Sequence, residues 1–317
     1  MFYRLIKFPA QLAIYLYCRI LIVNNKELFG SKGPILIASN HPNSFLDAII
    51  VDTLFKYPVT SLTRGDVFKN KYINKILRAL NMLPIFRVSE GVENLELNYK
   101  TFDTCQHIFK QNGLVLIFSE GGCINEWHLR PLKKGTARLA INCWKEGIPL
   151  RVLPMGINYS SFRKFGKNIR INFGQFITAE QMDIDLNSGK AFITFNGLLK
   201  EELGKLVYEV DETDIEKQHQ LFSHNIARWK KILLFIPAVI GFIFHAPLYY
   251  PIIAFVNKIR NDHYDSIVVG LLFLLYPIYL MVLVIVAYLI TGYLLSFLLI
   301  LILPFTAWCL LQLRNEI

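Results

Sequence analysis

Charged residues are scarce in this chain of 317 residues, and acidic residues are scarcer than basic ones. Asp, Glu, Lys and Arg make up 18% of the chain, against about a quarter in an ordinary soluble domain, and 53% of the residues are hydrophobic. These values exclude a disordered, collagen-like or low-complexity protein. Lys and Arg number 34 against 24 Asp and Glu, a formal net charge of +10. A basic excess suits nucleic acid, anionic lipid or a phosphorylated substrate, and the hydrophobic content favours a membrane surface over nucleic acid.

Cysteine is sparse and shows no paired spacing. The odd number of cysteines and the lack of a C-x-x-C pair argue against a disulfide framework and against a zinc site. We therefore expect a reduced, cytoplasm-facing soluble part, with no bound metal and no cofactor. The five cysteines are Cys18, Cys105, Cys123, Cys143 and Cys309.

Asp, Glu, Lys, Arg and His are absent from residues 267–311. A bilayer core needs about 20 apolar residues per helix, so this stretch can hold two membrane crossings. Thr291-Gly292 is the natural place to divide them. The sequence therefore predicts transmembrane helices at 267–290 and 293–311.

A further apolar run covers residues 232–256, where His245 is the only side chain that titrates near neutral pH. Basic clusters flank this run on both sides, and Arg314 follows the last apolar stretch. Cytoplasmic flanks carry the excess of Lys and Arg, so a segment that enters and returns on one side fits best. Three prolines, Pro237, Pro247 and Pro251, are expected to break such a re-entrant segment. The alternative is three ordinary crossings.

The first 28 residues are apolar, with basic residues and aromatic rings among them. They resemble a signal peptide poorly, because no small-residue cleavage site follows. A helix lying in the headgroup region of a membrane fits this composition. The alternative is a helix that packs in the core of the soluble part.

Between these hydrophobic ends, short apolar runs alternate with helical patterns. Strands separated by helices indicate an α/β domain with a mixed, largely parallel sheet and flanking helices. The expected strands are 34–39, 59–63, 83–86, 114–118, 150–158 and 169–173, and the expected helices are 46–55, 70–80, 95–110 and 135–144. We predict a membrane-associated helix at 1–28, a catalytic domain at 29–180, a charged helical extension at 181–228 and a membrane region at 229–317.

Residues 40–47 read N-H-P-N-S-F-L-D and lead from a strand into a helix. Histidine titrates near neutral pH, so His41 can accept a proton from a substrate hydroxyl. A carboxylate on its other ring nitrogen, here Asp47, fixes the tautomer and stabilises the imidazolium. The alternative is that Asn43 or Ser44 caps the helix, Asp47 interacts favourably with its dipole and His41 has no role.

Further polar residues follow other predicted strands, where α/β domains collect their chemistry. Glu120, Gly121 and Gly122 end the strand 114–118, and two glycines permit close approach of a ligand to the backbone. Arg87 also follows a strand and can bind a phosphate with two hydrogen bonds. Arg130, Lys133 and Lys134 precede the helix at 135–144 and add positive charge. For each basic residue alone, the alternative is a solvated surface charge.

Four blocks in this order resemble those of the glycerolipid acyltransferase family. That family shows N-H-x4-D, a block ending in F-x-R, the block F-P-E-G-T-R and a strand of the I-P-V type. The chain has N-H-P-N-S-F-L-D (40–47), L-P-I-F-R (83–87), F-S-E-G-G (118–122) and V-L-P-M-G-I (152–157). The similarity covers roughly residues 30–175, and Lys134-Gly135 matches a K-G pair that commonly follows the third block.

The chain departs from the family pattern at two places. Five residues separate His41 from Asp47, where four are usual, so either the turn bulges or the helix phase is altered. Gly122 and Cys123 stand where Thr and Arg are usual, so the usual phosphate-binding arginine is missing. An F-x-E-G-G block with a longer spacing resembles a glycerol-3-phosphate or dihydroxyacetone-phosphate branch of the family.

The resemblance implies transfer of a fatty acyl chain from acyl-CoA or acyl carrier protein to a glycerolipid hydroxyl. His41 and Asp47 are the implied catalytic pair. Glu120, Gly121, Gly122, Arg87 and Lys134 are the implied substrate-binding residues, with Asn40 and Ser44 in support. The expected acceptor is 1-acylglycerol-3-phosphate, with glycerol-3-phosphate, dihydroxyacetone phosphate or an inactive lipid-binding protein as alternatives. We expect membrane lipids but no nucleic acid as partners, and an integral protein of a bacterial inner membrane with a cytoplasmic catalytic domain.

Overall fold

The computed structural model describes residues 2–86, 96–182, 184–259 and 263–314. The strands are β1 (Cys18–Val23), β2 (Ile35–Ser39), β3 (Val59–Arg64), β4 (Met82–Ile85), β5 (Leu114–Phe118), β6 (Arg151–Tyr159) and β7 (Lys167–Phe173). The helices are α1 (Phe2–Tyr17), α2 (Phe45–Leu54), α3 (Lys71–Ala79), α4 (Leu97–Lys110), α5 (Lys134–Lys145), α6 (Ala191–Leu206), α7 (Ile215–Phe222), α8 (Arg228–Val256), α9 (Tyr264–Thr291) and α10 (Leu299–Leu313).

The chain divides into two compact units. We call the first the catalytic unit; it comprises Met1–Gln11, Ile22–Asn158 and Arg170–Thr213. We call the second the membrane unit; it comprises Leu12–Leu21, Tyr159–Ile169 and Asp214–Ile317.

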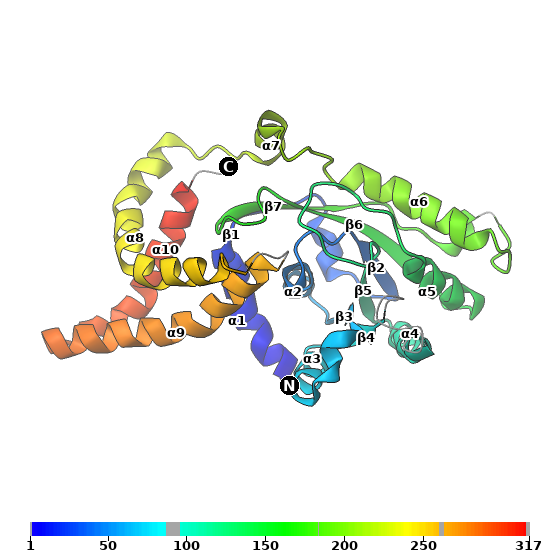
Figure 1. Cartoon of the computed structure of the whole chain (residues 1–317), viewed down its shortest axis with the longest axis horizontal. Helices are drawn as coiled ribbons and strands as arrows, with labels where there is room; N and C mark the ends of the chain where they lie inside the picture. The colour runs from blue at the N-terminus through cyan, green and yellow to red at the C-terminus, as the bar shows by residue number, and fades with distance from the viewer. Residues whose placement is uncertain (1, 87–95, 183, 260–262, 315–317) are drawn as a thin grey trace. The chain divides into compact units, whose positions relative to one another are not determined.

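Seven strands form one sheet in the order β1-β7-β6-β2-β5-β3-β4. The neighbours β2 and β5, β2 and β6, β3 and β5, and β3 and β4 are parallel, as the alternation of strands and helices predicts. Every residue of the central strand β2 is buried. A strand that reads as one continuous apolar run is typical of a parallel sheet covered on both faces. Figure 1 shows α2 on one side of this sheet and α5 and α6 on the other.

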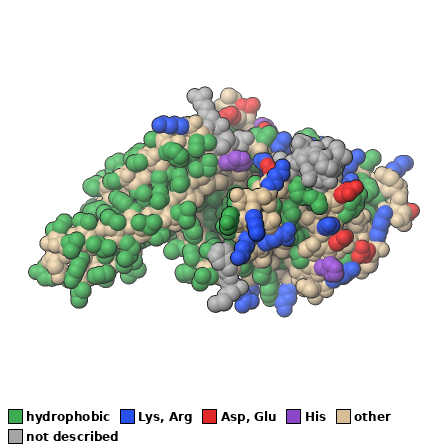
Figure 2. All heavy atoms as spheres, turned by 60° about the horizontal axis from the view of Figure 1, so that its bottom comes forward, with side chains coloured by type: hydrophobic (Ala, Val, Ile, Leu, Met, Phe, Trp, Pro, Cys, Tyr) green, Lys and Arg blue, Asp and Glu red, His purple; other side chains and the backbone are tan. Residues whose placement is uncertain are grey.

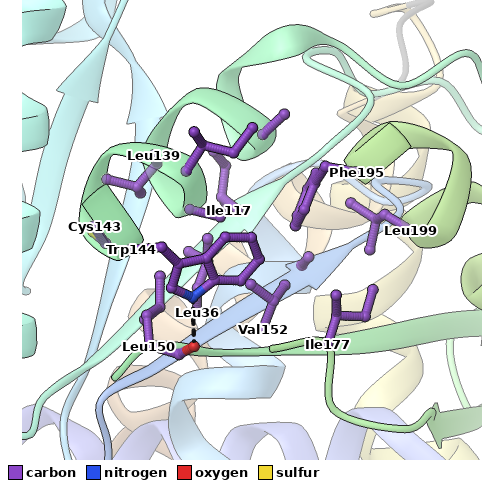
Figure 3. Packing of buried hydrophobic residues seen from close by; sticks show 14 of the residues in the cluster. Leu36, Ile117, Leu139, Cys143, Trp144, Leu150, Val152, Ile177, Phe195 and Leu199 are labelled. Atoms are coloured by element: carbon purple, nitrogen blue, oxygen red, sulfur yellow. Dashed lines mark hydrogen bonds between the residues drawn. The ribbon is translucent and has the colours of Figure 1, made fainter. Parts of the chain in front are cut away.

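The main core of the catalytic unit lies between the sheet and helices α4, α5 and α6 (Figure 3). The indole of Trp144 on α5 packs edge-on against the Phe195 ring of α6, and its Nε1–H donates to the Leu150 carbonyl at 2.8 Å. Phe195, Leu199 and Leu203 are completely buried in this core. Helix α6 is therefore part of the catalytic unit, where the sequence predicted a separate charged extension at 181–228. Only α7 of that predicted extension lies in the membrane unit.

The N-terminal segment contains a helix and a strand, where the sequence predicted one helix over 1–28. Helix α1 ends at Tyr17, and the next residues form β1. In the catalytic unit, polar side chains of α1 bond to the end of α2: Lys7 Nζ donates to the Phe55 carbonyl, and Gln11 Nε2 donates to that of Thr53, both at 2.6 Å. Its large apolar side chains Leu5 and Phe8 are each 72% exposed. Ile14 and Tyr17, further along the same helix, are buried, so α1 has both exposed and buried apolar side chains, and its contact with a membrane stays a prediction.

Three helices of the described part are long and apolar enough to cross a membrane: Arg228–Val256, Tyr264–Thr291 and Leu294–Leu313. In Figure 2 the visible side chains of these helices are mostly hydrophobic. Helix α9 ends at Thr291, and Gly292 follows with a left-handed φ of 70°, which places the break between the last two spans as predicted.

The prolines of α8 do not interrupt it, contrary to the predicted break. The helix is continuous from Arg228 to Val256 and bends along its length (Figure 1). A proline inside a helix removes one hydrogen bond and kinks the axis, but neighbouring helices can satisfy the backbone groups that it frees. The hydroxyl of Tyr279 on α9 donates to the Phe244 carbonyl at 2.8 Å, one turn before Pro247. This bond lies next to the Ile243 carbonyl, which Pro247 leaves without its helical donor.

A buried ion pair joins two segments of the membrane unit. Lys167 of β7 pairs with Asp265 in the first turn of α9, and both side chains are almost completely inaccessible. The Tyr17 hydroxyl donates to the same carboxylate at 3.0 Å. Buried charges are tolerated when they are paired and hydrogen-bonded, so this cluster fixes the start of α9 within its unit.

Candidate active site

Parallel pairing brings the two loops of the site together. In the register of β2 and β5, Ser39 lies opposite Phe118 at the carboxyl ends of both strands. His41 and Glu120 each follow two residues later, so the same edge of the sheet carries both. The Ser119 N–H extends the pairing by donating to the Ser39 carbonyl at 2.8 Å. The sheet therefore builds the site from segments about 80 residues apart in the chain.

The predicted pair of His41 and Asp47 is in contact. His41 Nδ1 lies 2.8 Å from Asp47 Oδ2, and the carboxylate is completely buried. The imidazole stacks on the Phe118 ring, with centroids 3.8 Å apart and planes 7° from parallel. Its side chain is 16% exposed, and Nε2 has no hydrogen-bond partner in the part of the chain that the structure describes. The ring is thus held by one nitrogen and one face, which leaves the other nitrogen for a ligand.

Ser44 accommodates the five-residue spacing between His41 and Asp47. It precedes the first residue of α2 and has a φ of 53°, which is rare for a residue other than glycine. Its N–H donates to Cys123 Sγ at 2.8 Å. The reversed turn places Asp47 in the first turn of α2, where Oδ2 also accepts the Asn43 N–H at 2.8 Å. Backbone strain at Ser44 therefore explains the unusual spacing.

Glu120 is buried and binds backbone on both sides. Its Oε2 accepts the His41 N–H at 3.0 Å, and its Oε1 accepts the Arg130 N–H at 3.0 Å. Burial raises the pKa of this carboxyl, while the two backbone N–H donors act in the opposite direction. The sequence suggested contact with the acceptor, but both carboxylate oxygens are engaged with loops. We therefore assign Glu120 to positioning of His41.

Asn40 closes the site on the side of β6. Its amide donates to the Ile157 carbonyl at 3.0 Å and accepts the Ile157 N–H at 2.8 Å. Because β2 and β6 are parallel neighbours, these two bonds continue their pairing beyond the end of β2. Asn40 therefore joins the loop that carries His41 to β6, and its supporting role in catalysis stays a prediction.

The glycine loop after β5 has a closely packed backbone. Gly121 has a left-handed φ of 66°, and a Cβ there would lie 2.8 Å from the Lys133 side chain. The Gly121 N–H donates to the Phe118 carbonyl at 3.1 Å, whereas that of Gly122 has no acceptor among the described residues. The two glycines therefore differ: Gly121 makes the turn, and Gly122 keeps a free donor.

The described residues include only one of the two predicted phosphate-binding side chains, that of Lys134. Arg87 lies outside the described residues. Lys134 is exposed at the start of α5, and within the described ranges it makes no hydrogen bond through its side chain. Arg130 was expected from the sequence only to add positive charge. Unlike Lys134, it makes polar contacts through its side chain. Its Nη1 donates to the Gly122 carbonyl at 3.2 Å, and its Nε lies 3.4 Å from Glu126 Oε1.

Three contacts of the site had no clear signal in the sequence. Phe118 stacks under His41, Cys123 accepts the Ser44 N–H, and Asn125 Nδ2 donates to the Pro42 carbonyl at 2.7 Å. Each joins the loop after β2 to the loop after β5. The departure at Cys123 from the family pattern was the one visible hint.

Substitution of Glu120 tests its positioning role. Glu120→Ala leaves two buried N–H donors without an acceptor, each costing about 1–3 kcal/mol in the free energy of unfolding. Glu120→Gln keeps one acceptor oxygen, so we expect a loss about half as large. Thermal unfolding of the purified protein measures both, with the exposed Glu201→Gln as control. A drop in Tm no larger than that of the control would contradict this role.

Part of the chain is similar to known acyltransferases. A family model described as Acyltransferase matches residues 20–158, somewhat less than half of the chain. Glycerol-3-phosphate O-acyltransferase 1 of Saccharomyces cerevisiae is 29% identical over 117 residues, which are 36% of this chain and 15% of that protein. The chain thus spans only a small part of that relative's length.

The structure of the 1-acyl-sn-glycerophosphate (LPA) acyltransferase PlsC from Thermotoga maritima superposes with a TM-score of 0.43. The sequence identity is 12%, and the match covers 63% of this chain and 75% of that one. The family match over residues 20–158 encloses the catalytic pair, the glycine loop and the strands that carry them. Residues 20–158 therefore match an acyltransferase domain, and the sequence comparison supports a likeness to glycerolipid acyltransferases.

Proposed function

We propose that the protein is a membrane-bound O-acyltransferase that transfers a fatty acyl chain from acyl-CoA or acyl carrier protein to the hydroxyl of 1-acylglycerol-3-phosphate. The observation that carries the proposal is the geometry of His41. One ring nitrogen is held by a buried carboxylate, the ring face is fixed by Phe118, and Nε2 is left for the substrate. This is the arrangement that a general base requires.

The reaction needs no covalent enzyme intermediate. His41 Nε2 takes the proton from the acceptor hydroxyl as its oxygen attacks the thioester carbonyl carbon. The tetrahedral intermediate then collapses, the C–S bond breaks, and the thiolate takes the proton from the imidazolium. Asp47 holds Nδ1–H in place and stabilises the positive charge while the proton is on the ring.

The negative oxygen of the tetrahedral intermediate needs a hydrogen-bond donor. The N–H groups of His41, Asn43 and Gly121 already donate to Glu120, Asp47 and Phe118, respectively. Gly122 is the remaining glycine of the loop, and its N–H is not used by a described residue. We therefore assign oxyanion stabilisation to Gly122.

Arg130 is the described basic residue best placed to contact the acceptor phosphate. The Gly122 carbonyl and Glu126 fix its guanidinium beside the glycine loop, which lowers the entropy lost when an anion binds. It takes the place of the arginine that is missing from the third block. Arg87 and Lys134 complete the proposed phosphate contacts.

The lipid substrates explain why the protein has three long apolar helices. An acyl donor and a product with two acyl chains partition into a bilayer, and an anchored enzyme meets them there. We propose an integral membrane protein of a bacterial inner membrane whose catalytic unit faces the cytoplasm. The basic cluster Arg228, Lys230 and Lys231 lies in the chain between the last segment of that unit and the first apolar run, as a cytoplasmic flank would.

Glycerol-3-phosphate is the second candidate acceptor, with dihydroxyacetone phosphate as a related one. Two observations favour it: the yeast relative is named for glycerol-3-phosphate, and the third block ends in E-G-G without the usual arginine. An inactive lipid-binding protein is the alternative of a different class, and the intact contact of His41 with Asp47 argues against it.

A screen of acceptors with one labelled acyl-CoA tests the proposal. The purified protein in nanodiscs is given glycerol-3-phosphate, dihydroxyacetone phosphate, 1-acylglycerol-3-phosphate or an uncharged monoacylglycerol, and the products are separated by chromatography. We expect the highest kcat/KM with 1-acylglycerol-3-phosphate, and little transfer without a phosphate. Preference for glycerol-3-phosphate would select the second candidate, and no transfer to any acceptor would favour the lipid-binding alternative.

A further inference from the structure

Helix α3 has large apolar side chains on its outer face. Tyr72 is 80% exposed, Ile76 52% and Ile73 45%. The edge of this face is used by the protein: Leu77, one turn after Ile73, packs in a small core with Phe68 and Met82. The helix is well formed, because Asn70 caps it by accepting the N–H groups of Tyr72 and Ile73. The exposed apolar face therefore belongs to an ordered element.

The same segment is strongly basic. Residues 67–81 contain four basic side chains and no acidic one. Lys69, Lys71 and Lys75 are exposed and make no ion pair with any residue that the structure describes. The preceding acid, Asp66, is already paired with Arg64. The positive charge of α3 is thus available to an external partner.

A hollow beside α3 is lined by both apolar and basic side chains. It has a volume of about 380 Å³ and lies between the 3-10 helix η2 (Gly65–Lys69), α3 and α4. Its apolar lining includes Phe68, Phe86 and Leu97, and its basic lining is Lys69, Arg78 and Lys100. A lining that is part apolar and part basic fits a phospholipid, whose phosphate the cations would bind while its glycerol and first methylenes contact the apolar side chains.

We propose that η2 and α3 form a docking surface through which the catalytic unit lies on an anionic phospholipid bilayer. Tyr72, Ile73 and Ile76 enter the interface, the lysines bind lipid phosphates, and the hollow holds one headgroup. A basic, apolar helix is the kind of element that binds in the headgroup region of anionic membranes. The inference is independent of the proposed reaction, because it concerns how the catalytic unit contacts the membrane and not what it transfers.

Quenching by brominated lipids tests the docking surface in the full-length protein. Tyr72→Cys is labelled with a fluorophore in a Cys123→Ser background, since the other four cysteines are buried. The protein is placed in nanodiscs whose acyl chains carry bromine, made of phosphatidylcholine alone or with phosphatidylglycerol. Ile193→Cys is the matched control, because Ile193 is 73% exposed on α6 of the same unit. We expect at least twofold stronger quenching at position 72 than at 193, and only in the anionic discs.

Charge reversal tests the role of the lysines. Each basic residue removed should lower the ratio of docked to undocked molecules about fivefold, so Lys71→Glu with Lys75→Glu should abolish the extra quenching. Lys145→Glu with Lys200→Glu is the matched control. Arg78→Gln removes one cation from the lining of the hollow and should lower the ratio of docked to undocked molecules in the same way. Equal quenching at positions 72 and 193 would overturn the proposal. So would quenching at position 72 that changes neither with the charge of the lipids nor on charge reversal of Lys71 and Lys75. Energy transfer between labels on two copies would instead assign this face to self-association and would also overturn it.

Discussion

Replacement of His41 by alanine is expected to lower kcat for acyl transfer by about 10²- to 10⁴-fold, the range that general acid–base catalysis supplies. The acceptor hydroxyl then has no base within reach, because Nε2 of this ring is the proposed proton acceptor. Binding of the acyl donor is left to other residues, so its KM should change little. Initial rates with labelled acyl-CoA in nanodiscs measure both constants.

His107→Ala is the matched control for this substitution, because His107 lies exposed on α4 of the same unit. It should keep kcat within about twofold of the wild type, as a surface substitution does not alter the site. The unfolding transition of each variant shows whether a loss of rate reflects chemistry or misfolding. A folded His41→Ala protein with the wild-type rate would remove His41 from the reaction.

Two substitutions of Asp47 are expected to have unequal effects. Asp47→Ala removes both the orientation of His41 and the stabilisation of the imidazolium, so we expect kcat to fall about 10²- to 10⁴-fold. In Asp47→Asn, the Asn43 N–H should orient the amide oxygen into the place of Oδ2, where it still accepts from His41 Nδ1–H. Only the charge is then lost, and the rate should fall less than with alanine.

Rates of both variants, alongside the exposed Asp103→Asn on α4 as control, separate orientation from charge. Equal losses in the alanine and asparagine variants would show that the Asn43 N–H does not orient the amide. Wild-type rates in both would place Asp47 outside the catalytic machinery.

Most of the catalytic unit could be predicted because its strands are buried on both faces. A strand such as 114–118, with five apolar residues between a glycine and a serine, has few other interpretations. The first strand, β1, escaped prediction because C-R-I-L-I-V directly continues the apolar pattern of α1. Short apolar runs do not by themselves distinguish a strand from the end of a helix. Pairing within the sheet decides this, and pairing is a long-range property.

The site, too, has features that could be predicted from the sequence and features that could not. His41, Asp47 and Glu120 could be singled out because their residue types and their places after strands are local features. The role of Glu120 could not be predicted, because it depends on two backbone N–H groups. One of them belongs to His41, which is 79 residues away in the chain. Similarly, Cys123 is an isolated departure from a pattern until the reversed turn at Ser44 brings an N–H to its sulfur. Contacts made through the backbone leave no trace in side-chain patterns.

A single-turnover experiment tests catalysis by His41 most directly, because it isolates the chemical step from product release. Enzyme in excess is mixed with labelled acyl-CoA in nanodiscs, and 1-acylglycerol-3-phosphate is then added. We expect wild-type protein to form diacylated product in one rapid phase, and His41→Ala to form it at least 10²-fold more slowly, with no label bound covalently to either protein before the acceptor arrives. Equal single-turnover rates, or a covalently acylated enzyme that passes its label to the acceptor, would contradict direct attack assisted by His41.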